Sequence, residues 1–183
     1  MNKNITLLAG AATALVLTAC STSDMGKKKE MKVPSAPAAV TVPEGNKVVM
    51  TTVGIGDLTY ECRAKADAPK EFAWTLAAPD AVLYDSKKVA VGKYYAGPTW
   101  ESNDGSKVTG KQVAVSPNPG SIPLQLVKAN PATGNGAMTG ITYIQRLDTK
   151  EGQAPTTACG AGNAGAKQKV KYQADYVFYK AAM

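Results

Sequence analysis

The chain has 183 residues, with 21 Lys and Arg against 14 Asp and Glu, a net charge of +7 and no histidine. The absence of histidine excludes Ser-His-Asp and Cys-His catalysis and histidine-based zinc sites, so catalysis would need carboxylates, Tyr, Lys or Arg. The excess charge is spread along the chain, and residues 24–32 contribute only +2 of it. We therefore expect no nucleic-acid partner.

The first twenty residues, MNKNITLLAGAATALVLTAC, have the composition of an export signal: Lys3, an uncharged apolar run over 5–17, then small residues before Cys20. The run is shorter than the ~20 residues of a membrane span. The tetrapeptide ending at Cys20 resembles the lipobox of bacterial lipoproteins, which implies cleavage after residue 19 and acylation of Cys20. Ser21 then favours the outer membrane, with the domain in the periplasm or at the cell surface. An ordinary secretory signal that ends near a cysteine is the alternative.

Residues 20–45 are expected to form a flexible tether. They carry a lysine cluster at 27–29 and prolines at 34, 37 and 43, with few large apolar groups to bury. The lysines would either be attracted loosely to anionic envelope polymers or remain simply solvated. A single globular domain is expected over 46–183.

Alternation of apolar and polar residues dominates that domain, which predicts an all-β fold: an antiparallel β-sandwich or barrel of about eight to ten short strands. The apolar runs over 78–84 and 122–128 are short enough to be helical instead, which leaves an α+β fold with one or two short helices as the alternative. The predicted strands, in chain order, span residues 48–53, 56–65, 71–77, 81–84, 88–94, 99–102, 107–116, 122–128, 139–148 and 169–180.

Two cysteines remain once Cys20 is acylated, and an even pair in an oxidising compartment predicts one disulfide, Cys62 to Cys159. Leu58, Tyr60 and Cys62 alternate with polar residues, so the disulfide is expected on the buried face of its strand.

The most distinctive stretch is YYAGPTWESNDGS, residues 94–106. Its Asp-Gly pair predicts a hairpin turn. Its aromatic residues could be core or could line a groove, and its carboxylates could be solvated turn residues or an acid–base pair. Arg146 lies within an apolar strand, where we expect an ion pair with Asp85 or Glu101, or else an anion site. The candidate binding residues are Tyr94, Tyr95, Trp100, Glu101, Asp104 and Arg146.

The ordered landmarks of the mature chain resemble a secreted bacterial and fungal domain family of unknown function with a YAGPTWE-x-DGS signature. Two positions depart from that pattern: Tyr94 stands where relatives have histidine, and Leu124 stands where an aromatic residue is expected. The resemblance implies a secreted, disulfide-linked, mainly β domain and no established activity. The landmarks are YEC at 60–62, Trp74, PDAVLYD at 79–85, YAGPTWE at 95–101, DGS at 104–106, IPL at 122–124, IQR at 144–146, AP at 154–155, Cys159 and the aromatic strand from Tyr172 to Tyr179.

These features predict a non-enzymatic envelope lipoprotein that binds a glycan, small ligand or protein. One alternative is a lysozyme inhibitor, by analogy with small disulfide-linked β-barrel lipoproteins. A second is a glycan-active enzyme that uses Glu101 with Asp104 or Asp85. No cofactor is expected, because GIGDLT at 54–59 lacks the glycines of a dinucleotide fingerprint and is followed by a strand. No metal is expected either, since the chain lacks the histidines of a histidine-based zinc site.

Overall fold

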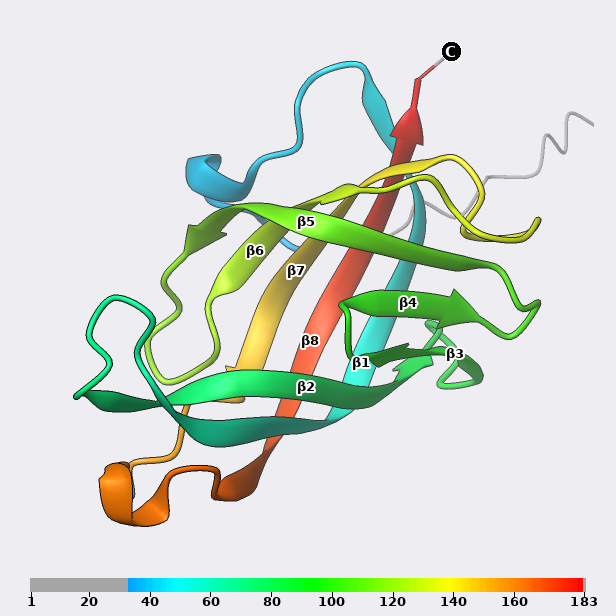
Figure 1. The fold of residues 1–183 in the computed structure, drawn as a ribbon. Helices are drawn as coiled ribbons and strands as arrows, with labels where there is room; N and C mark the ends of the chain where they lie inside the picture. Colours follow the sequence, from blue (N-terminus) through cyan, green and yellow to red (C-terminus); the bar gives the residue numbers. More distant parts are fainter. Residues whose placement is uncertain (1–32, 183) are drawn as a thin grey trace, which may run out of the picture. The chain divides into compact units, whose positions relative to one another are not determined.

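The computed structural model describes residues 33–182, which form a closed barrel of eight antiparallel strands. Each strand pairs with the next one along the chain, and β8 pairs back with β1 (Figure 1). The prediction of an all-β fold is confirmed, in its barrel form. The strands are β1 (Asn46–Ala64), β2 (Phe72–Tyr84), β3 (Ala90–Tyr95), β4 (Thr99–Ser102), β5 (Lys107–Ser116), β6 (Leu124–Ala129), β7 (Ile141–Glu151) and β8 (Lys167–Ala181).

Helical structure is minor. The described residues contain two short 3-10 helices, η1 (Ala38–Val40) and η2 (Ala161–Asn163), and no helix long and apolar enough to cross a bilayer. The runs over 78–84 and 122–128, which could have been helical, contribute to β2 and β6 instead. The α+β alternative is therefore wrong.

Strand β1 joins two strands that the sequence predicted separately, over 48–53 and 56–65, because residues 54 and 55 between them continue the strand. A Cβ atom at Gly54 would lie 2.6 Å from a ring carbon of Tyr176, and one at Gly56 would overlap the backbone of β2 at Asp80. Glycine therefore permits close approach of the neighbouring strand and ring at these positions. Strand β2 joins two predicted strands in the same way, and Pro79 lies within it.

The barrel interior holds the main hydrophobic core, to which all eight strands contribute. Side chains of a strand alternate between its two faces, so residues two apart point inward together. Strand β8 follows the expected pattern, since Tyr172, Ala174, Tyr176 and Phe178 are all buried in this core. Burial of such side chains contributes roughly 25 cal/mol per Å² of apolar surface removed from water.

A second, smaller core lies on the outside of the barrel, beneath the chain that precedes β1. Val40 is fully buried there against Leu126, Leu147 and Val177, and its carbonyl accepts a hydrogen bond of 2.6 Å from Nε2 of Gln145. Half of the tether expected over residues 20–45 lies outside the described residues, and the other half, residues 33–45, is described and packs on the barrel. The packed domain thus begins before residue 46, because this segment covers apolar side chains on the outer faces of β6, β7 and β8.

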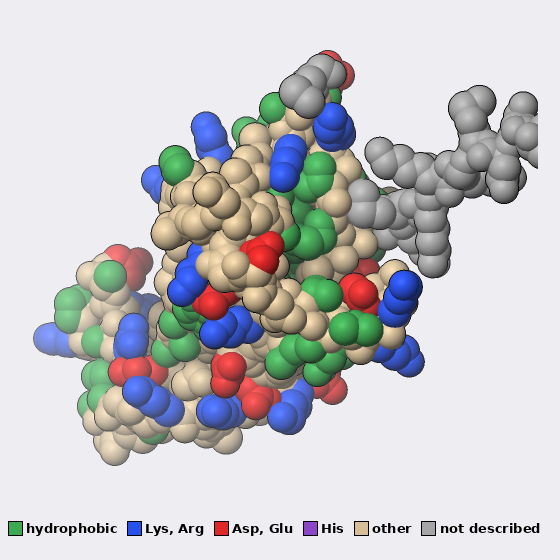
Figure 2. Space-filling view, turned by 90° about the vertical axis from the view of Figure 1, so that its right-hand side faces the viewer, with side chains coloured by type: hydrophobic (Ala, Val, Ile, Leu, Met, Phe, Trp, Pro, Cys, Tyr) green, Lys and Arg blue, Asp and Glu red, His purple; other side chains and the backbone are tan. Residues whose placement is uncertain are grey.

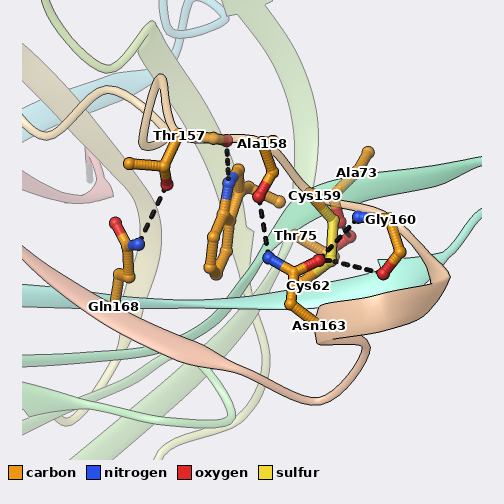
Figure 3. Close-up of a disulfide and its surroundings, with 10 residues drawn as sticks. Cys62, Ala73, Thr75, Thr157, Ala158, Cys159, Gly160, Asn163 and Gln168 are labelled. Carbon is orange, nitrogen blue, oxygen red and sulfur yellow. Dashed lines mark hydrogen bonds between the residues drawn. A yellow bond between two sulfur atoms is a disulfide. The ribbon is translucent and has the colours of Figure 1, made fainter.

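The predicted disulfide is present and joins β1 to the loop between β7 and β8, with 5.5 Å between the Cα atoms of Cys62 and Cys159. Figure 3 shows Asn163 beside it, accepting a hydrogen bond from the Gly160 N–H and donating one to the Ala158 carbonyl. The half-cystines lie 97 residues apart in the sequence, and closing a loop of that length stabilises the fold by about 4 to 5 kcal/mol in the chain-entropy model.

Candidate functional site

The six candidate binding residues lie in three different places. Tyr94, Trp100 and Arg146 are buried and point into the barrel, with Trp100 only 1% exposed. Tyr95 and Glu101 point outward from β3 and β4, and Asp104 lies in the turn between β4 and β5. The stretch 94–106 therefore spans the β3–β4 hairpin and the turn that leads to β5. Its side chains point to opposite faces of the sheet, so they do not form one site.

The inward face of the hairpin belongs to an interior aromatic cluster of Tyr94, Trp100 and Tyr176. The rings of Tyr94 and Trp100 are stacked with centroids 4.7 Å apart, and Trp100 meets Tyr176 edge-on at 5.7 Å. Such pairs add roughly 0.5 to 1.5 kcal/mol beyond the burial of their area. Burial raises the pKa of the Tyr94 and Tyr176 hydroxyls, so both stay protonated at neutral pH and neither suits a general base.

Arg146 is the most informative residue of the interior, because it is 6% exposed and has no carboxylate partner. Its Nε and Nη2 donate hydrogen bonds of 3.2 and 2.9 Å to the Pro123 carbonyl. The acidic side chains described between residues 33 and 182 form no ion pair with it. The expected pairing with Asp85 or Glu101 is wrong: Asp85 accepts two backbone N–H groups of its own turn, and Glu101 points outward.

Four tyrosine side chains lie near enough to Arg146 for the guanidinium charge to act on their hydroxyls. Burial raises the pKa of Tyr60, Tyr94, Tyr172 and Tyr176, and the positive charge of Arg146 opposes that rise in all four. Three of these hydroxyls already take part in hydrogen bonds, Tyr60 with the Gly152 carbonyl and Tyr172 with Tyr176. The interior therefore holds one buried cation among neutral hydroxyl groups.

Strand register places Arg146 in an inward row that crosses five strands: Thr52, Tyr176, Arg146, Gln125 and Val115. Each pairs directly with the next, so all five share the inner face. Exposure rises along the row, since Tyr176 is fully buried, Gln125 is half-buried and Val115 is 46% exposed. The solvent-exposed end of the row is therefore the end on β5.

The β5 end is open because β4 is short. Strand β4 pairs with β5 only as far as Thr109, so within the described residues the stretch of β5 from Lys111 to Ser116 has no strand on that side. Gln112 faces inward opposite the buried Val127 and is nonetheless exposed. We call this the open side of the barrel. In Figure 1 it lies between β5 and β2, with β6, β7 and β8 behind.

The outward carboxylates of the hairpin are fully engaged and do not form an acid–base pair. The Tyr95 hydroxyl donates to Glu101 at 2.7 Å and, with Lys107 and Lys93, lowers the pKa of that carboxyl. Asp104 accepts hydrogen bonds from the Ser106 hydroxyl and from the backbone N–H groups of Ala137 and Ser106, which lower its pKa to about 2. A general acid needs a raised pKa, and both of these are lowered.

Charged side chains elsewhere on the surface also lie near groups of opposite charge. Acidic and basic groups are interspersed on the face drawn in Figure 2, with no extended area of one sign. Residues 33–182 also contain no group of three or more Cys, Asp or Glu side chains placed to hold a metal ion.

A family model described as "Protein of unknown function (DUF3455)" matches residues 43–180. The chain belongs to the DUF3455 family. The match covers nearly all of the described barrel, and it confirms the resemblance to a domain family of unknown function at that level. Comparisons with curated proteins and with solved structures gave no match.

Several interior residues of this DUF3455 domain were not among the predicted site residues. Tyr172 and Tyr176 were predicted to lie in one aromatic strand, yet nothing in the sequence showed that this strand pairs with the strand of Arg146. Thr52, Gln125 and Tyr60 join the same region only through pairing between strands distant in sequence. The alternation of a strand gives the face of each side chain and leaves its neighbours across the barrel undefined.

Asp104 gives the DUF3455 domain a testable pH dependence. Its carboxyl pKa is lowered from 3.8 to about 2 in the folded state, so its stabilising effect is complete above the unfolded-state pKa and disappears as the pH falls through about 2. Asp104→Asn should therefore lower the urea midpoint at pH 7 and have little effect near pH 2. Asp67→Asn, at an exposed carboxylate without a hydrogen bond or ion pair among the described residues, is the control. An equal loss at both pH values would contradict the assignment.

Proposed function

We propose that this protein is a non-enzymatic binding protein of the bacterial envelope, which takes a small ligand into the barrel through the open side. The observation that supports this proposal best is the inward row of side chains. Its members are exposed at Val115 and buried at Arg146 and Tyr176. Concave sites in barrel mouths, lined by aromatic groups with a few polar ones, are a common form of ligand site.

Binding without catalysis fits the chemistry of this region. The interior tyrosines Tyr172 and Tyr176 have raised pKa values, so neither hydroxyl is poised to act as a base at neutral pH. Glu101 and Asp104, the carboxylates of the enzyme alternative, have lowered pKa values and are occupied by neighbouring donors. No observation favours the lysozyme-inhibitor alternative.

The envelope location rests on residues 1–20, which lie outside the described residues. The apolar run that ends at Leu17-Thr18-Ala19-Cys20 supports acylation of Cys20 and retention at the outer membrane. Several acyl chains, each stabilising insertion by ~0.8 kcal/mol per buried CH₂, would hold the chain at the bilayer surface.

Entry through the open side can be tested with 1-anilinonaphthalene-8-sulfonate, whose fluorescence rises in apolar surroundings. The mature chain carrying Cys20→Ser removes the need for detergent. In this background, Val115→Trp should fill the open side and weaken dye binding at least about tenfold, which corresponds to 1.4 kcal/mol. Val82→Trp places the same ring at a position 38% exposed on β2, outside the inward row, and should leave binding unchanged. Cooperative thermal unfolding must be retained in both, since partly unfolded states also bind the dye.

Two outcomes would contradict interior binding. In one, the folded chain fails to enhance the fluorescence of the dye. In the other, Val115→Trp and Val82→Trp affect the dye equally, which would place it on the outer surface.

The anchor has its own test. Cys20→Ser should move the protein from the membrane fraction to the soluble fraction after cell lysis, and metabolic labelling with a palmitate analogue should mark the wild-type chain alone. Ser21→Ala retains the cysteine and serves as the control. Equal labelling of wild type and Cys20→Ser would overturn the assignment of the lipid to Cys20.

A further inference from the structure

Within the part of the chain that the structure describes, the barrel interior holds more hydrogen-bond donors than acceptors and no negative charge that pairs with Arg146. We propose that the ligand carries a carboxylate, bound by Arg146, beside an apolar or aromatic body that packs on the interior aromatic cluster. This inference rests on the proposed function, because it names the chemical class of the ligand taken through the open side.

The free edge of the Arg146 guanidinium defines where the carboxylate would bind. A guanidinium has five N–H donors in a planar fork. Nε–H and one Nη2–H of Arg146 are used by the Pro123 carbonyl, and the remaining three N–H groups have no acceptor among residues 33–182. The edge between Nη1 and Nη2 therefore remains available, and its two parallel donors match the two oxygens of a carboxylate.

Two further donors in the same interior also lack partners. The indole Nε1 of Trp100 and the hydroxyl of Thr52 are buried without a hydrogen bond among the described residues. Trp100 packs edge-on against Tyr176, and Thr52 lies opposite Tyr176 in the inward row, which places both against the residue that adjoins Arg146. Buried donors are normally satisfied, so an acceptor group is the missing partner.

The charge balance leads to the same class of ligand. The titratable groups that face Arg146 from the surrounding strands are Tyr60, Tyr94, Tyr172 and Tyr176, and all four are neutral at pH 7 because burial raises their pKa values. A buried cation without a counter-ion is costly, and a bound monoanion would neutralise it.

The aromatic rings set the nature of the remainder of the ligand. Tyr94 and Trp100 lie stacked, and Tyr94 is close enough to Arg146 for the guanidinium charge to act on its hydroxyl. A ligand whose carboxylate binds Arg146 would therefore place its adjoining atoms near apolar ring surface. Aromatic carboxylic acids are the simplest compounds with both features.

Benzoate and benzamide separate charge from shape, because they differ only in the group that would meet Arg146. Each is titrated into the Cys20→Ser chain loaded with 1-anilinonaphthalene-8-sulfonate, and the concentration that displaces half the dye is measured. Hydrogen bonds to charged groups contribute more than neutral ones, so benzoate should act at a concentration at least about tenfold lower than benzamide. Arg146→Gln should bring the ratio close to one. Arg146→Lys, which keeps the charge and loses the fork, should give an intermediate ratio.

Arg63→Gln is the matched control, because Arg63 is the other arginine of the chain and pairs with Glu61 on the outer surface. It should leave the ratio at its wild-type value. If the dye binds inside the barrel and benzoate and benzamide displace it equally, the carboxylate inference is wrong and the proposed function stands. If the dye does not bind inside the barrel, the proposed function and the carboxylate inference are both wrong. The wild-type comparison decides the question even if Arg146→Gln does not fold.

Discussion

The pairing of β1 with β8 is the constraint on which the interior depends. It joins residues 46–61 to residues 167–181 over almost the whole length of both strands and so closes the sheet. Closure places Thr52 beside Tyr176 and turns the aromatic face of β8 inward, where Gly54 leaves room for the Tyr176 ring. The disulfide at Cys62 ties the β7–β8 loop to the end of the same strand, so the covalent link and the closing pair reinforce one another.

Placing Arg146 inside this closed sheet works against stability. Apolar side chains of similar volume are often as stabilising as buried charges or more so, which makes an unpaired arginine an expensive core residue. The fold compensates only partly, through two hydrogen bonds to the Pro123 carbonyl. Local rules of folding are broken most often at functional positions. Here the buried arginine lies in the row of inward side chains that begins on the part of β5 that β4 leaves unpaired.

Much of the fold followed from the sequence. Alternation gave the all-β class and most of the strands, cysteine number gave the disulfide, and the Asp-Gly pair gave the β4–β5 turn. The packing of residues 33–45 was missed because their own composition resembles a linker, whereas the reason they pack lies in Leu126, Leu147 and Val177 on other strands. The predicted partners of Arg146 were wrong for a related reason, since the sequence could not show that Glu101 and Arg146 face opposite sides of the barrel wall.

The central claim is that a carboxylate ligand binds inside the barrel and satisfies the donors there. Its most direct test is a proton–nitrogen NMR titration of the two tryptophan indole N–H groups with benzoate. The Trp100 N–H has no acceptor among residues 33–182, whereas the Trp74 N–H already donates to the Thr157 carbonyl at 2.8 Å and serves as an internal reference. The account predicts that the Trp100 signal moves to higher proton frequency as it gains an acceptor, while the Trp74 signal stays in place. A Trp100 signal that remains unchanged up to saturation with benzoate would contradict it.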